Sequence, residues 1–172
     1  KNIWSVTRQL KYSVQNENSL DMVLSLNGFP IVAMELKNQF TGQNVHHAIN
    51  QFKNDRDPRE LIFSFNKRIL VYFAVDTDDV FMATELKAKS TFFLPFNRGN
   101  NGGKGNVSVP DKVKTHYLWE DILLQDSLID ILKRFYYIEK KEKTDKYGKK
   151  IVKEKAIFPR YHQLDVVRKI EK

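Results

Sequence analysis

Apolar and polar residues follow one another in short blocks along this chain. The alternation over residues 3–14 predicts one or two edge strands, and residues 20–26 and 31–37 predict two further strands. Asn27-Gly28 lies between the latter two and is a strong hairpin signal, because both residue types tolerate the positive φ angles of a tight turn. We therefore expect an antiparallel hairpin over residues 20–37.

Helical spacing follows the predicted hairpin. Apolar residues from Val45 to Phe52 recur on one helical face, and this helix should end before Asp57-Pro58. Residues 68–75 have the continuous apolar character of a buried strand, and a polar turn over residues 76–79 leads into a partner strand at 80–86. Strands and helices thus interleave, which predicts an α/β fold with a mixed central β-sheet flanked by helices.

The second half of the chain also combines segments typical of strands, loops and helices. A short apolar segment at 91–96 precedes a loop rich in glycine and asparagine at 97–106. Residues 118–135 predict one helix or two short ones, with a cap at Asp126 or Ser127. Residues 161–172 form a final amphipathic pattern, whose apolar stripe we expect to pack against a partner beyond this chain.

Composition narrows the class of protein. A chain of 172 residues with 41% hydrophobic residues can build one sizeable core. Its longest apolar run, residues 69–75, is far shorter than the roughly 18 to 20 residues that cross a bilayer, so we expect no membrane association. The absence of cysteine excludes disulfides, thiolate zinc sites and cysteine nucleophiles, and it fits a cytoplasmic location.

The positive charge is concentrated near the end of the chain. The sequence has 29 Lys and Arg against 21 Asp and Glu, a net charge of +8. Residues 139–172 contribute 12 basic and 6 acidic side chains, so most of the excess lies there. Because lysines alternate with acids around Tyr147-Gly148, we favour a solvated hairpin or linker over a dedicated contact with DNA.

Two carboxylates in the predicted hairpin carry the main chemical signal. If residues 27–29 form a three-residue loop, Leu26 pairs with Pro30 and Asp21 lies directly opposite Glu35. Opposed residues have Cβ atoms about 4.5 to 5.5 Å apart, and like charges at that distance destabilise a sheet. A divalent cation between the carboxylates would remove the repulsion.

Oxygen ligands without Cys or His favour a hard ion, Mg²⁺ or Mn²⁺, completed by water and phosphate oxygens. Lys37 lies two residues beyond Glu35 and points to the same side of the strand. It could orient or help deprotonate an attacking water, or offset charge on a scissile phosphate, which together outline phosphodiester hydrolysis. The alternative is a structural ion-pair cluster, because the pattern Glu-x-Lys occurs three times, ending at Lys37, Lys87 and Lys141.

The run Leu20-Asp21-Met22-Val23-Leu24-Ser25-Leu26-Asn27-Gly28-Phe29-Pro30-Ile31-Val32-Ala33-Met34-Glu35-Leu36-Lys37-Asn38 resembles the N-terminal nuclease domain of the restriction (motor) subunit of type I restriction-modification enzymes. These domains belong to the RecB-like branch of the PD-(D/E)xK nuclease class and have a restriction-endonuclease-like core. The resemblance implies metal binding by Asp21 and Glu35, a catalytic role for Lys37, and Mg²⁺-dependent cleavage of double-stranded DNA driven by a separate ATP-powered motor. It also implies a catalytic Gln51 from a Gln-x-x-x-Tyr element, although Asp55 stands where tyrosine is expected.

The resemblance continues into the tail. The segment Phe158-Pro159-Arg160-Tyr161-His162-Gln163 resembles the entry to a helicase-like motor, in which Gln163 would contact adenine. We therefore predict an endonuclease domain at 1–138, followed at 139–172 by a linker hairpin and the start of the motor region. ATP would be used only by the full-length subunit, and the partners would be double-stranded DNA, the methylation and specificity subunits and the motor domains of the same polypeptide. The alternative function is a non-catalytic DNA-binding or interdomain module of a larger translocase. We also expect the chain to begin within a longer protein, so further site residues could precede Lys1.

Two other patterns fail as sites. The glycine-rich stretch at 99–105 lacks the spacing and the Ser or Thr of a phosphate-binding P-loop, so it reads as a flexible loop. His46 and His47 are adjacent on the predicted helix and point about 100° apart, which disfavours joint chelation of a metal.

Overall fold

The computed structural model describes residues 1–144, 147–148 and 150–171. One six-stranded mixed sheet forms its centre, with the strands in sequence order. Strands β3 and β4 are parallel, and every other neighbouring pair in this sheet is antiparallel. The strands are β1 (Trp4–Lys11), β2 (Ser19–Leu26), β3 (Phe29–Leu36), β4 (Val71–Val75), β5 (Val80–Ala83) and β6 (Leu94–Pro95). The predicted α/β fold with a mixed central sheet is confirmed.

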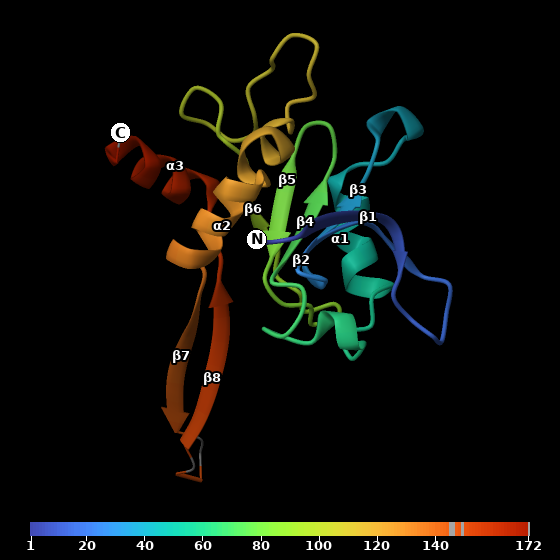
Figure 1. Cartoon of the computed structure of the whole chain (residues 1–172), viewed down its shortest axis with the longest axis vertical. Coiled ribbons are helices and arrows are strands. Elements are labelled where there is room, and N and C mark those ends of the chain that lie inside the picture. The colour runs from blue at the N-terminus through green and yellow to red at the C-terminus, as the bar shows by residue number, and fades with distance from the viewer. Residues whose placement is uncertain (145–146, 149, 172) are drawn as a thin grey trace.

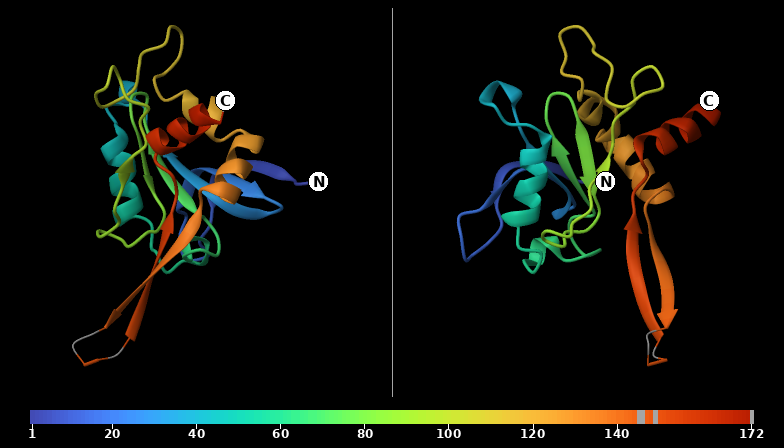
Figure 2. Two further views of the ribbon diagram at one scale, coloured as in Figure 1. Left: turned by 90° about the vertical axis from the view of Figure 1, so that its left-hand side faces the viewer. Right: turned by 180° about the vertical axis from the view of Figure 1, so that it is seen from behind.

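Helices cover both faces of this sheet (Figures 1 and 2). The helix α1 (Val45–Asn54) lies on one face, with the short turns η1 (Gln39–Thr41) and η2 (Leu61–Phe63) before and after it in the chain. The other face is covered by η3 (Leu118–Ile122), α2 (Gln125–Arg134) and α3 (Tyr161–Ile170). No helix in the described ranges is long and apolar enough to cross a membrane.

A second, two-stranded sheet projects from the body (Figures 1 and 2). Its strands are β7 (Tyr137–Thr144) and β8 (Lys150–Ile157), which pair antiparallel. The hairpin predicted for the charged tail is therefore confirmed. The predicted boundary between residues 138 and 139 stays a prediction, and Phe158 just beyond the hairpin packs into the core of the main body.

Each face of the main sheet has its own apolar core. Because both faces are covered, all five residues of β4 are buried, as the continuous apolar run predicts. Phe73 and Met34 face the cluster with α2 and α3, whereas Tyr72 and Ala33 face the cluster with α1. The side chains of α1 that enter this second cluster are the predicted ones, Val45, Ala48, Ile49 and Phe52.

The β2–β3 hairpin reaches the expected register by a different route from the one predicted. The turn has two residues, Asn27-Gly28, and Leu26 pairs with Phe29 rather than Pro30. The register then shifts at Leu24, which pairs with Val32, so that Ile31 is the extra residue of a β-bulge. The three-residue loop was wrong, but beyond the bulge the predicted pairing holds through Met22 and Met34.

Residues 118–135 form two short helical elements, η3 and α2, which is one of the two predicted alternatives. Two other expectations for the later helices are corrected. The N-cap of α2 is Leu124, which has no side-chain cap, instead of Asp126 or Ser127. The last helix packs within this chain at its first turns, because Leu164 is buried in the core with α2. Val166 in the middle of the helix and Ile170 at its far end present apolar surface to solvent.

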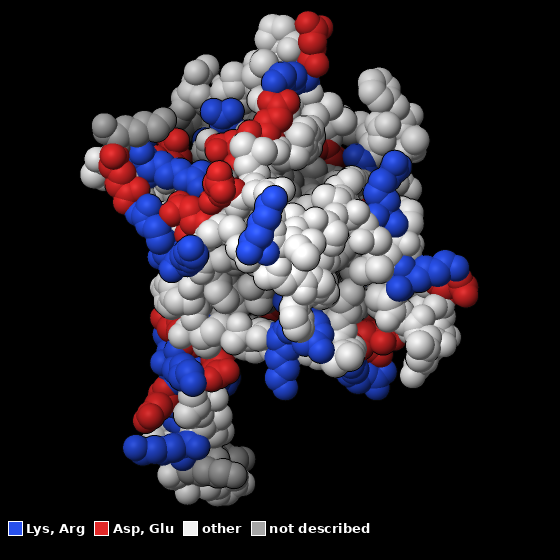
Figure 3. Space-filling model, in the orientation of Figure 1, with Lys and Arg blue, Asp and Glu red and all other residues white. Residues whose placement is uncertain are grey.

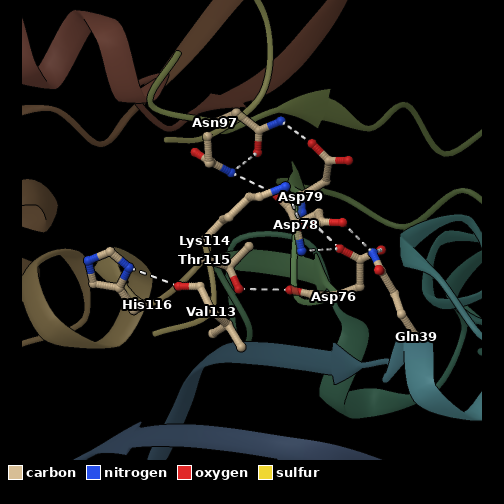
Figure 4. A network of polar contacts seen from close by, with 10 residues as sticks. Gln39, Asp76, Asp78, Asp79, Asn97, Val113, Lys114, Thr115 and His116 are labelled. Atoms are coloured by element: carbon tan, nitrogen blue, oxygen red, sulfur yellow. Dashed lines mark hydrogen bonds and ion pairs between the residues drawn. The ribbon is translucent and has the colours of Figure 1, made fainter. Parts of the chain in front are cut away.

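A buried aspartate joins the end of β4 to the start of α1. The Oδ2 atom of Asp76 accepts a hydrogen bond from the backbone N–H of Val45 at 2.9 Å, and Oδ1 accepts from the N–H groups of Asp78 and Asp79, both at 2.8 Å. Figure 4 shows this network, in which Gln39 and Thr115 also contact the Asp76 residue. The turn predicted over residues 76–79 is therefore a structural junction, in which backbone donors satisfy the buried carboxylate.

Replacing this carboxylate should destabilise the fold. Asp76→Ala leaves the three N–H groups without their acceptor, and we expect it to lower the free energy of unfolding by about 3 kcal/mol. Asp78→Ala is the matched control, because the Asp78 side chain is 38% exposed and its ion pair with Lys114 should contribute less than about 1 kcal/mol. Urea unfolding followed by circular dichroism measures both changes, and equal losses would contradict this role of Asp76.

Candidate active site

Two of the predicted site residues, Asp21 and Glu35, meet at the end of β3, on the face that α1 covers. Strand alternation places Glu35 on the same face as Ala33, and places Asp21 on the same face as Val23, and both apolar residues belong to the α1 core. Lys37 follows directly after β3, and its backbone N–H donates to the carbonyl of Val75 at 2.8 Å. The parallel pairing of β3 with β4 thus continues one residue beyond the end of β3, to Lys37.

Glu35 is completely buried and pairs with a residue that the sequence did not reveal. Its Oε1 atom accepts from Arg56 Nε at 2.9 Å and from Arg56 Nη2 at 2.6 Å. Arg56 is itself 4% exposed and also donates to the carbonyl of Ser19 at 2.7 Å. The other carboxylate oxygen, Glu35 Oε2, is buried and has no hydrogen-bond partner among the described residues.

Asp21 lies beside Glu35 but is partly open to solvent. Its Oδ2 atom accepts from the backbone N–H of Leu36 at 2.8 Å, and its Oδ1 atom accepts from Gln9 Nε2 at 3.0 Å. Each oxygen therefore retains a lone pair for another ligand. Glu35 forms the buried floor of the site and Asp21 its accessible wall.

The electrostatics of Glu35 confirm that the two carboxylates are neighbours. Burial is the largest influence and raises the pKa of the Glu35 carboxyl from 4.5 to about 8. Arg56 acts in the opposite direction, because a cation favours the charged carboxylate, whereas Asp21 raises the pKa further through its negative charge and through a hydrogen bond with the protonated Glu35 carboxyl. The predicted juxtaposition of Asp21 and Glu35 is thus present, with Arg56 as the cation that the repulsion requires.

The other predicted residues take different positions. The side chain of Lys37 is partly exposed and forms no ion pair within the described part of the chain. Gln51 is half-buried on α1, where its carbonyl accepts from the N–H of Asp55 at the end of the helix. Gln163 lies in α3, away from this site, and its Oε1 atom accepts from the N–H of Arg160 at 2.9 Å.

Three further residues contribute to the site. Besides Arg56, Gln9 links β1 to Asp21 and has the unusual φ of 49°, a conformation that side chains other than glycine adopt rarely. The Arg56 guanidinium lies over the ring of Tyr12, with 5.8 Å between Arg56 Cζ and the ring centroid. Burial raises the pKa of the Tyr12 hydroxyl. Nothing local marks these residues, because β1 and the end of α1 meet only in the folded chain.

This arrangement fits a small hard cation. The unpartnered Oε2 of Glu35 and the accessible oxygens of Asp21 supply two carboxylate ligands, a number typical of Mg²⁺ sites that are completed by water and phosphate. Groups of three or more acidic or histidine side chains with metal-binding geometry do not occur among the residues that the structure describes. The donors therefore favour Mg²⁺ or Mn²⁺ over a metal that needs a full cage of side chains.

Comparison with known proteins identifies the family of this chain. A relative from Methanocaldococcus jannaschii, named "Putative type I restriction enzyme MjaVIIIP endonuclease subunit", is 25% identical over 170 residues. The alignment covers 98% of this chain and 15% of that protein, so the chain spans only a small part of its relative. No solved structure matches the chain. Residues 1–91, which include both carboxylates, Lys37 and Arg56, match the family described as the type I restriction enzyme R protein N terminus, and the chain therefore belongs to that family.

Proposed function

We propose that this chain is a metal-dependent endonuclease domain of the PD-(D/E)xK class that cleaves DNA within a type I restriction enzyme. The observation that carries this proposal is the pair of neighbouring carboxylates, Asp21 and Glu35, with a buried Glu35 oxygen that lacks a partner. Once Glu35 is ionised, this buried oxygen has no donor, which is costly, and a cation bound there would remove that cost. Family membership supports the same function.

The residues divide the chemistry according to their exposure. Glu35 and Asp21 would hold Mg²⁺, with Mn²⁺ as a substitute, through their carboxylate oxygens. When bound, this cation would activate a water and stabilise negative charge on the scissile phosphate. Lys37 has a partly exposed ammonium without a competing acid, so it can orient the attacking water or offset charge on the phosphate. Gln51 would orient DNA or the lysine.

Arg56 gives the site a stable form before the cation binds. The buried Glu35 carboxylate and the neighbouring Asp21 carboxylate would repel each other without a counter-ion, and the Arg56 guanidinium supplies the positive charge. Both of its contacts go to Oε1, so Oε2 stays available. Arg56 thus holds Glu35 in position, and a bound cation would share the carboxylate instead of displacing the arginine.

The complete protein would carry further activities. From the resemblance of residues 158–163 to the entry of a helicase-like motor, we propose that the full-length polypeptide contains an ATP-driven motor, with Gln163 contacting adenine. Its partners would be double-stranded DNA and the methylation and specificity subunits, in the cytoplasm. ATP would serve translocation, while the site with Asp21, Glu35 and Lys37 would cut the DNA.

The Arg56–Glu35 contact also favours a second candidate. A buried ion pair can serve structure alone, in which case the chain would be a non-catalytic DNA-binding or interdomain module. The two functions differ in whether a divalent cation binds at Glu35. Binding can be measured without any cleavage assay.

Substitutions at the site should abolish cleavage selectively. In the complete enzyme, we expect Asp21→Asn, Glu35→Gln and Lys37→Met each to eliminate double-strand cleavage and to leave ATP hydrolysis unchanged, because none of them belongs to a nucleotide site. Gln51→Ala should reduce cleavage less than Glu35→Gln. Gel assays of plasmid linearisation and a phosphate-release assay measure the two activities, and retained cleavage in any two of the first three variants would refute the assignment.

Removing Arg56 should expose the cation site thermodynamically. We expect Arg56→Ala to lower the free energy of unfolding by about 3 kcal/mol, because the buried Glu35 carboxyl loses its counter-ion and both of the hydrogen bonds that Arg56 donates to it. Added Mn²⁺ should recover more stability in this variant than in the unmodified protein. The control is Arg59→Ala, whose exposed pair with Asp57 should matter little and show no Mn²⁺ effect. Equal Mn²⁺ effects in all three proteins would support the structural alternative.

The raised pKa of Glu35 predicts a pH dependence of stability. The folded protein holds a proton on Glu35 that the unfolded chain releases near its ordinary pKa of 4.5. In a cation-free buffer, this stabilisation is present below about pH 4.5 and is lost as pH rises towards about 8. Urea unfolding of the unmodified protein and of Glu35→Gln across this range measures the effect. The stability difference between them should change in this window, and a constant difference would contradict the shift.

A further inference from the structure

The register of the β7–β8 hairpin separates charges that alternate in the sequence. Directly opposed residues share a face, so the pairs Lys141 with Lys153 and Glu139 with Lys155 lie on one face. We call this the lysine face, and its charged residues are Glu139, Lys141, Lys143, Lys153 and Lys155. The charged residues of the opposite, balanced face are Lys140, Glu142, Lys150 and Glu154. One face therefore has a net charge of +3 and the other a net charge of zero.

Ion pairs complete this contrast. On the balanced face, Lys140 pairs with Glu154 at 3.0 Å and Lys150 pairs with Glu142 at 3.6 Å, so every charge there has a partner. On the lysine face, Lys141 contacts Glu139 at 3.2 Å. The remaining lysines of that face, Lys143, Lys153 and Lys155, have no ion pair within the described ranges.

The opposed pair Lys141 and Lys153 is unfavourable by itself. Like charges directly opposite each other destabilise an antiparallel pair of strands. A sequence in which one of these lysines changed places with an acid of the balanced face would avoid the repulsion. An external anion would convert the repulsion into attraction. The lysine face is therefore arranged for a negatively charged ligand.

This face also lines a groove, which makes it a site rather than an open surface. The groove has a volume of about 550 Å³ and runs between the hairpin and the segment after β5. Thr84 Oγ1 donates to the carbonyl of Ala156 at 2.9 Å and holds the two walls together at the base of the hairpin. Arg160, just after β8, adds a further cation, and the opposite wall presents Lys87, paired with Glu85 at 2.6 Å, and Phe92, whose aromatic ring is 75% exposed. Figure 3 shows Lys and Arg side chains along the projecting hairpin and at the adjacent edge of the body.

We propose that this groove binds the sugar–phosphate backbone of DNA, at a site separate from the cleavage centre. Lysines two residues apart on a strand are about 6.8 Å apart, so they form a row of cations that suits an extended polyanion. A single small anion would need converging donors such as backbone N–H groups, which a ladder of paired strands does not offer. None of the residues that line the groove comes from the β2–β3 hairpin with Asp21 and Glu35. That the polyanion is DNA rests on the proposed function.

A charge-matched pair of variants tests this proposal in the 172-residue chain. Lys141→Gln with Lys153→Gln removes two cations from the lysine face, and Lys140→Gln with Lys150→Gln removes two from the balanced face. Binding of a fluorescently labelled DNA duplex is measured by anisotropy in EDTA over a series of salt concentrations. We expect the lysine-face variant to bind at least about tenfold more weakly at low salt, with a salt slope smaller by about 1.8, which corresponds to two phosphate contacts. The balanced-face variant should bind like the unmodified chain.

Additional measurements separate this site from folding and from catalysis. Thermal unfolding of the lysine-face variant should show an equal or higher Tm, because the repulsion between Lys141 and Lys153 is removed. Glu35→Gln should bind the duplex like the unmodified chain even though it would eliminate cleavage, so the two sites can fail independently. Equal weakening in both double variants, or no DNA binding by the unmodified chain at low salt, would overturn the proposal.

Discussion

The buried contact between Arg56 and Glu35 is the interaction on which the rest of the site depends. The contact joins the segment after α1 to the end of β3, and a further hydrogen bond from Arg56 reaches the carbonyl of Ser19 at the start of β2. Three segments that are distant in sequence therefore meet at one guanidinium. A buried charge requires a partner, so the position of each element is fixed by the need to keep this pair together.

A buried polar contact also holds the opposite end of α1 in place. Asp76 binds the N–H of Val45 at the helix start, just as Arg56 binds Glu35 beyond the helix end. Between these two polar contacts, Ala48 and Phe52 fill the core against the sheet. The helix is held at both ends, so the carboxylates beneath it are kept in a defined geometry. Such rigidity is what a site that binds a small hard cation requires.

The two acidic regions of the body illustrate how the same side chains serve different purposes. Around Asp76, backbone N–H groups and neighbouring amides satisfy the carboxylates, as Figure 4 shows. Around Glu35, one oxygen is left without a donor. The carboxylate of Asp76 therefore serves as a structural junction, whereas the Glu35 oxygen without a donor is the position at which the proposed function would place a cation. The projecting hairpin extends this principle to cations, because Lys143, Lys153 and Lys155, which form no ion pair with any residue that the structure describes, share one face.

The sequence alone determined the elements and the two carboxylates. Alternation and spacing predicted the strands, the helix α1 and its buried residues, since these patterns depend on short-range geometry. They also placed Asp21 beside Glu35, although the turn was shorter than predicted and a bulge at Ile31 restored the register. The tertiary structure alone decided which cation neutralises Glu35 and how the lysines of the tail divide between two faces. Arg56 and Glu35 are 21 residues apart, and no local pattern records a contact that forms only when α1 packs on the sheet. The lysines alternate with acids along the chain, but strand pairing sorts them by face, because the register rather than the composition decides which charges are neighbours.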